Sequence, residues 1–71
     1  MNTKEALEKL YGGEKVKTMF DDTDIFYQTF EHDTIARMII KSHCSAEVIS
    51  RFTPEEFLIA HEGITMVEVE T

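Results

Sequence analysis

Cysteine is nearly absent from this chain, whose 71 residues contain a single one, Cys44. No internal disulfide can form, and a lone cysteine fits a reducing compartment. A chain of this length makes one domain at most, residues 1–71, and buries only about 60% of the surface that its unfolded form exposes. Small domains often gain stability from a partner subunit. We therefore expect either very good packing or a homodimer.

Long apolar runs are also missing. No stretch approaches the roughly 20 apolar residues that a membrane-spanning helix needs. The first residues, Met1 to Glu5, include an acid and lack the apolar region of a signal peptide. We expect a cytoplasmic protein, in the host cytoplasm if a phage encodes it, with no membrane partner.

The motifs of the common enzyme classes are missing as well. The chain has three glycines, of which Gly12 and Gly13 are adjacent, so it contains no phosphate-binding loop, nucleophile elbow or dinucleotide fingerprint. Nothing in the sequence marks a base or an oxyanion hole for Cys44. We expect a protein that is not an enzyme, with no catalytic residues and no cofactor.

Metal-binding patterns fail on residue type and spacing. A calcium loop that opens at Asp22 would need an oxygen ligand at Phe26, a glycine at Tyr27 and a glutamate at Asp33. The candidate zinc ligands are His32, His43, Cys44 and His61. Two of these four are adjacent, which rarely lets both bind one metal, and the other two are isolated. We expect no metal site.

Negative charge is what the chain has in excess, with a formal net charge of −7. Residues 21–33 carry −5 and residues 52–71 carry −5, with no Lys or Arg in either segment, whereas residues 1–20 and 34–51 carry +1 and +2. Acidity alone predicts only solubility. Its concentration in two segments also predicts a charged interaction face.

The N-terminal half predicts a helix followed by strands. Asn2 and Glu5 have the spacing of a capping box for a helix over residues 3–11, which Gly12-Gly13 ends. Alternation, short acids and aromatic enrichment predict the segments that follow: a short strand within 14–20, a turn over 21–24 and a strand over 25–30.

Residues 34–42 admit two interpretations. As a strand returning from a hairpin loop at 31–33, they would face the core with Ala36, Met38 and Ile40 and face outward with Arg37 and Lys41. As a helix capped by an aspartate, they would bury a different face. Two adjacent isoleucines favour the strand slightly.

The C-terminal part predicts helix and then strand. Apolar spacing favours a helix over 45–52, and Thr53-Pro54-Glu55-Glu56 has the pattern of a second helix start. Gly63 ends this helix, and alternation over 64–70 predicts a final edge strand. The fold class is α+β, with an N-terminal helix, an antiparallel sheet of three or four strands, and helical segments at about 45–61 packed on it.

A weaker hypothesis places a helix-turn-helix over 34–52, where the local charge is +2. Ser42-His43-Cys44 stands where the turn glycine is expected. The acidity of the whole chain opposes contact with phosphates, and we expect no direct nucleic-acid partner. A DNA-binding regulator therefore remains the least favoured alternative.

The leading hypothesis is a non-catalytic protein–protein interaction module. Its small size and acidity are typical of phage or mobile-element inhibitors, including anti-defence proteins and nucleic-acid mimics, that occupy a basic surface of a larger protein. The expected contact residues are acids and the aromatics between them: Asp21, Asp22, Asp24, Phe26, Tyr27, Phe30, Glu31 and Asp33. The alternative is a homodimeric structural or adaptor domain whose acidity serves only solubility.

Overall fold

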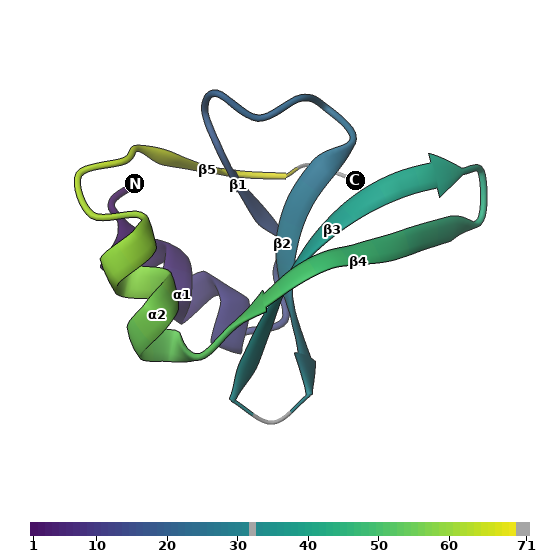
Figure 1. The fold of residues 1–71 in the computed structure, drawn as a ribbon. Coiled ribbons are helices and arrows are strands. Elements are labelled where there is room, and N and C mark those ends of the chain that lie inside the picture. The colour runs from purple at the N-terminus through teal and green to yellow at the C-terminus, as the bar shows by residue number, and fades with distance from the viewer. Residues whose placement is uncertain (32, 70–71) are drawn as a thin grey trace.

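The computed structural model describes residues 1–31 and 33–69, and within them it forms the α+β fold expected from the sequence (Figure 1). The antiparallel sheet of the described chain has five strands rather than three or four, in the order β4-β3-β2-β1-β5. The elements, in chain order, are α1 (Thr3–Tyr11), β1 (Val16–Thr18), β2 (Ile25–Glu31), β3 (Thr34–Ser42), β4 (Ser45–Phe52), α2 (Pro54–Ala60) and β5 (Met66–Glu68).

The two helices begin where local signals placed them. The Asn2 side chain accepts from the Glu5 backbone N–H at 2.8 Å, and the Glu5 carboxylate accepts from the Asn2 N–H, which completes the predicted capping box. Thr53 and Glu56 form the same reciprocal pair at the start of α2. After α1, Gly13 adopts φ +87°, a conformation that favours glycine.

Residues 34–42 form the strand β3, but their faces differ from the prediction. Ile35 packs beneath the helices, and Arg37 lies on the same face and bonds to Tyr27. Ala36 and Met38 are buried on the opposite face, and Ile40 is 44% exposed. The buried positions of Ala36 and Met38 and the exposed position of Lys41 are as predicted. The predicted outward position of Arg37 is wrong, because its guanidinium bonds to Tyr27 and Asp21. The predicted buried position of Ile40 is wrong, because this residue lies in the part of the strand that extends beyond the core.

The predicted helix over 45–52 is wrong, since this segment is the edge strand β4. Its pairing with β3 shifts by one residue at Ile49, between the pairs Arg37–Ser50 and Met38–Val48. This bulge interrupts the two-residue alternation, so the apolar spacing resembled that of a helix. The helix-turn-helix over 34–52 is wrong for the same reason: both of its proposed helices are strands.

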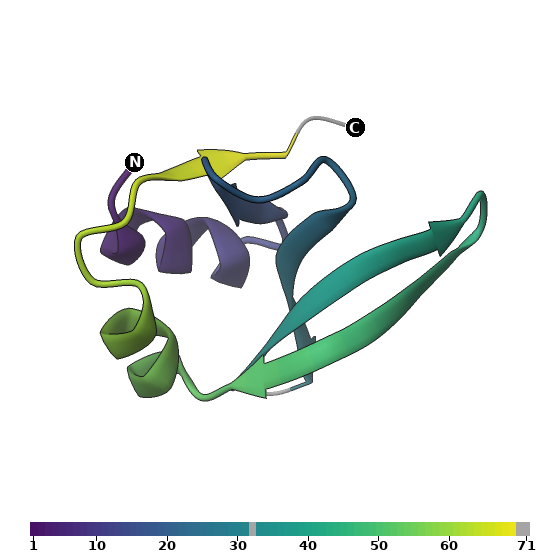
Figure 2. The same ribbon diagram turned by 45° about the horizontal axis from the view of Figure 1, so that its top comes forward.

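The core has two parts on opposite faces of the sheet. The face that we call the helix face packs helix and strand residues together: Ala6, Leu10, Val16, Tyr27, Ile35, Phe57 and Met66. The second cluster contains Phe26, Ala36 and Met38 and no helix residue. Figures 1 and 2 show the β3–β4 hairpin extending away from both helices, which is why its distal part, residues 40–47, is exposed.

The final strand lies at an edge, as predicted, but is shorter than 64–70, and residues 70–71 fall outside the described part. β5 pairs with β1 on one side. On its other side the Met66 N–H donates to the Met1 carbonyl and the Met1 amine donates to the Met66 carbonyl, both at 2.8 Å. The helices within residues 1–31 and 33–69 are all too short or too polar to cross a membrane.

Candidate functional site

The loop between β1 and β2, residues 19–24, presents the most exposed large apolar side chain of the described residues. Phe20 is 82% exposed and its neighbour Met19 is 56% exposed. Asp22 and Asp24 in the same loop are also exposed. An aromatic ring beside two carboxylates is a feature that a protein partner with an apolar pocket and basic rim would recognise.

Backbone hydrogen bonds attach this β1–β2 loop to the rest of the fold. The Met19 N–H donates to the Thr65 carbonyl at 3.1 Å, and the Asp24 carbonyl accepts from the Ile40 N–H at 2.8 Å. Inside the loop, the Ile25 N–H donates to the Asp22 carbonyl at 3.1 Å. The loop is therefore tied to β3 and to the segment before β5, and Phe20 projects from a supported backbone.

Asp21 serves the fold rather than the surface, since its side chain is only 9% exposed. One carboxylate oxygen, Oδ1, accepts from Arg37 Nη2 at 3.0 Å, and the other, Oδ2, accepts from the Thr18 N–H at 3.2 Å. The Asp21 N–H also donates to the Thr18 carbonyl. The acid that the sequence assigned to a partner is thus engaged within the chain.

Arg37 continues these contacts into the core through Tyr27 and His61. Arg37 only donates, and its Nη1 lies 2.8 Å from the Tyr27 hydroxyl oxygen. His61 Nδ1 lies 2.8 Å from the Phe57 carbonyl, which only accepts, so Nδ1 carries a proton. When His61 is a neutral imidazole, its Nε2 is unprotonated and accepts from the Tyr27 hydroxyl at 2.7 Å.

These four side chains, Asp21, Arg37, Tyr27 and His61, form what we call the buried polar network. Burial raises the pKa of the Tyr27 hydroxyl above its ordinary value, and the hydrogen bond and charge of Arg37 oppose that rise only in part. Every buried side-chain nitrogen and oxygen in the described part of the chain has a hydrogen-bond partner. The buried polar atoms of the network are therefore all satisfied, as a stable buried polar cluster requires.

The remaining predicted contact residues separate into buried and exposed groups. Phe26 is 5% exposed, with the Lys15 ammonium 4.9 Å from its ring centroid, and Tyr27 is 0% exposed. Phe30 is 45% exposed beneath the Arg51 guanidinium. Two acids, Glu31 and Asp33, are exposed at the other end of β2 from the β1–β2 loop.

Sequence reasoning missed Met19 and Phe20, which it assigned to a short strand within 14–20. β1 ends at Thr18, and the two residues that follow are exposed and belong to neither core cluster. Two large apolar residues directly before the acidic run at 21–24 were the available signal. Because both residues lie at the border between strand and turn, the sequence pattern alone did not show whether their side chains are buried or exposed.

The candidate zinc ligands do not converge. His61 is buried and hydrogen-bonded on both ring nitrogens, whereas His43 and Cys44 are exposed at the turn of the β3–β4 hairpin. His32 lies outside the described residues. Across residues 1–31 and 33–69, no group of three His, Cys, Asp or Glu side chains is placed to hold a metal ion.

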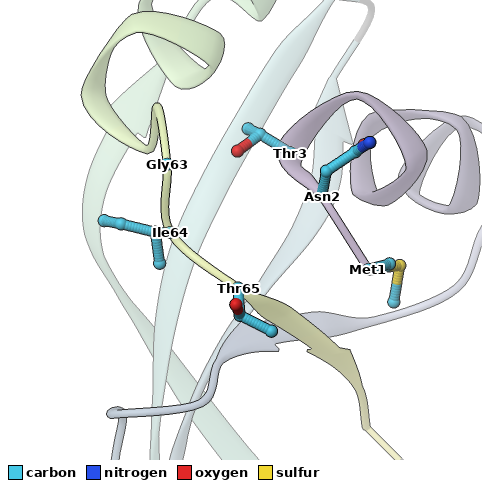
Figure 3. Close-up of a pocket in the computed structure, with 6 residues that line it drawn as sticks. All are labelled: Met1, Asn2, Thr3, Gly63, Ile64 and Thr65. Atoms are coloured by element: carbon cyan, nitrogen blue, oxygen red, sulfur yellow. The ribbon is translucent and has the colours of Figure 1, made fainter.

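A shallow pocket of about 290 Å³ lies where the N-terminus meets the link between α2 and β5, and Figure 3 shows its lining from these two segments: Met1, Asn2, Thr3, Gly63, Ile64 and Thr65. Its polar groups mostly serve the fold. The Thr3 hydroxyl donates to the His61 carbonyl at 2.7 Å, and Asn2 caps α1. None of the lining side chains is an acid or a base.

Comparison with known proteins finds no matching family model, no matching curated protein and no matching solved structure. A functional assignment therefore rests on the geometry and charge of the β1–β2 loop.

Proposed function

We propose that this chain is a non-catalytic protein–protein interaction module that acts as a small acidic inhibitor, with the β1–β2 loop as its contact surface. The partner is a larger protein with a basic surface, such as a nucleic-acid-binding site. Phe20 enters an apolar pocket there, and Asp22 and Asp24 pair with Lys or Arg at its rim.

The exposure of Phe20 carries this proposal. Burying a phenylalanine side chain contributes about 1.5–3 kcal/mol, and little of that contribution goes to folding when the residue is 82% exposed. Binding hot spots are few, and large side chains inserted into desolvated pockets dominate them. A ring on a supported loop meets this description because little ordering entropy opposes its docking.

Charge supports the choice of a basic partner. The chain carries −7 overall, and residues 21–33, which include the acids of the loop, hold five acids and no Lys or Arg. Complementary potentials accelerate association and reject partners of like charge, and their effect weakens as salt rises. Asp22 and Asp24 stay available for such pairing, whereas Asp21 does not, because Arg37 and Thr18 engage both of its oxygens.

Affinity purification from the cells that encode the chain tests the proposal, with immobilised wild type, Phe20→Ala and Tyr11→Ala compared side by side. Tyr11 is a matched control, since it is an aromatic that is 54% exposed at the end of α1. We expect a larger basic protein to bind wild type and Tyr11→Ala, and to bind Phe20→Ala at least about 30-fold more weakly, the equivalent of about 2 kcal/mol.

The same capture repeated with Asp22→Lys/Asp24→Lys, and over rising salt, tests the electrostatic part. Equal capture by wild type, Phe20→Ala and the charge-reversed variant would contradict the proposal. A homodimeric adaptor would instead elute at twice 8.2 kDa on sizing with no copurifying protein and little effect of salt.

A further inference from the structure

We infer that the buried polar network positions the β1–β2 loop, so that Asp21, Arg37 and Tyr27 are positioning residues for Phe20 although they lie beneath the contact surface. The inference rests on the proposed function for its biological meaning. The structural part of the inference is that the network holds the β1–β2 loop in one conformation. This part depends only on the contacts within the chain and can be tested without a partner.

Asp21 attaches the β1–β2 loop to the rest of the fold through side-chain hydrogen bonds. Its two carboxylate oxygens accept from two different parts of the fold, the Arg37 guanidinium on β3 and the Thr18 N–H at the end of β1. Phe20 lies between Thr18 and Asp21 in the sequence, so the Thr18–Asp21 hydrogen bonds fix the backbone on both sides of this exposed residue. Bonds from charged groups are stronger than neutral ones, and this pair is largely shielded from solvent.

Arg37 holds this position because Tyr27 fixes it from the other side. The guanidinium donates through Nη1 to the Tyr27 hydroxyl and through Nη2 to Asp21, and its carbon lies 5.6 Å from the centroid of the Tyr27 ring. On its other side the Tyr27 hydroxyl lies 2.7 Å from His61 Nε2, so hydrogen bonds hold it from both sides. Arg37 can only donate and the Asp21 carboxylate can only accept, so the directions of the Arg37–Tyr27 and Arg37–Asp21 bonds follow from their chemistry.

Opening the loop would leave several groups without partners at once. If Asp21 moved away, Arg37 Nη2 would lose its acceptor, and the Thr18 N–H would lose its side-chain acceptor as well. An unsatisfied group that stays partly buried disfavours the open state, so the loop is ordered before any partner arrives. A binding surface ordered in advance has a smaller entropic cost of association.

Hydrogen exchange of backbone amides in the free protein tests this inference, with Asp21→Asn and Tyr27→Phe as variants and Asp22→Asn as the control. Asparagine retains one acceptor oxygen and replaces the other with a donor, so it cannot serve both Arg37 and Thr18. Asp22→Asn removes the same charge from an exposed position of the same loop.

We expect the amides of Thr18 and Asp21 to exchange about tenfold faster in Asp21→Asn and in Tyr27→Phe, the size of one charge-assisted hydrogen bond. The amides inside α1 should change less, and Asp22→Asn should leave the two loop amides within about twofold of wild type. The Tyr27→Phe result is decisive, because residue 27 lies outside the loop and loses only its hydroxyl.

Unchanged exchange at Thr18 and Asp21 in both network variants would overturn the inference. Equal acceleration at the loop and inside α1 would also overturn it, because the network would then support only the fold as a whole. Phe20→Ala separates this test from the proposed function, because it should leave the exchange of both amides unchanged while weakening capture of the partner by at least about 30-fold. Slow exchange with unchanged capture by Phe20→Ala would retain the network and reject the function.

Discussion

At the scale of single residues, two phenylalanines have opposite roles: Phe57 packs in the core and Phe20 is exposed on the β1–β2 loop. Phe57 is 0% exposed and lies 5.3 Å from the Tyr27 ring and 4.6 Å from the His61 ring, centroid to centroid, whereas Phe20 is 82% exposed. We expect Phe57→Ala to lower the free energy of unfolding by about 3–5 kcal/mol and Phe20→Ala to change it by no more than about 0.5 kcal/mol. Urea unfolding of both variants measures this, and a comparable loss in Phe20→Ala would show that its ring packs.

Tyr27 makes the stability of the protein depend on alkaline pH. Because burial raises its pKa in the folded state, the unfolded chain releases the phenolic proton first as pH rises. The stability that the neutral hydroxyl contributes is therefore full below about pH 10, the ordinary tyrosine value, and falls as pH climbs from there through the raised folded pKa.

The check is urea unfolding at several pH values from neutral to strongly alkaline, on wild type, Tyr27→Phe and Tyr11→Phe. Tyr27→Phe should be less stable at neutral pH but lose less with alkali, and Tyr11→Phe, with an exposed ring, should follow wild type. An identical alkaline slope in all three proteins would assign that loss to other groups.

Single residues also show where sequence reasoning stopped. The aromatic strand at 25–30 was predictable from composition, and β2 occupies residues 25–31. Which of its rings reach solvent was not, because Phe26 and Tyr27 point to opposite faces and both faces are covered. Asp21 was equally hidden, since its partner Arg37 is 16 residues away in sequence and meets it only once β3 has folded back.

At the scale of elements, local signals succeeded and non-local pairing did not. Both capping boxes lie within four consecutive residues, so the starts of α1 and α2 could be predicted without knowledge of the fold. β4 depends instead on pairing with β3, and the bulge at Ile49 that disguised it exists only in that pairing. The β1–β2 loop was recognised as a turn at 21–24, but its extent was set by contacts with Thr65 and Ile40.

The cap of α2 gives a prediction at this scale. α2 spans only Pro54–Ala60, so its stability depends strongly on its first turn, where the Thr53 hydroxyl accepts from the Glu56 N–H at 3.2 Å. We expect Thr53→Ala to lower the free energy of unfolding by about 1 kcal/mol. Thr65→Ala is the matched control, an exposed threonine outside any helix, and should change it by less than about 0.5 kcal/mol. Equal urea midpoints for the two variants would show that the cap contributes nothing.

For the whole molecule, the acidity has two consequences of opposite sign. The ion pairs Lys9–Glu14 and Lys41–Glu47, both at 3.5 Å, are exposed, and exposed pairs contribute little to the free energy of folding. They therefore do little to offset the repulsion among the excess acids. The same excess attracts a basic partner. Salt screens both effects, and therefore should stabilise the fold while it weakens the complex.

Thermal unfolding of the free protein at rising sodium chloride tests the first of these consequences. With a net charge of −7 on 71 residues, we expect the midpoint to rise by a few degrees between about 0.01 M and 0.15 M salt, where the Debye length falls from about 30 Å to about 8 Å. Glu62→Gln/Glu68→Gln, which removes two exposed negative charges, should rise less steeply. A midpoint that falls with salt would mean that attractive pairs outweigh the net repulsion. The acidity would then already be balanced within the fold, and a basic partner would gain less from it than we propose.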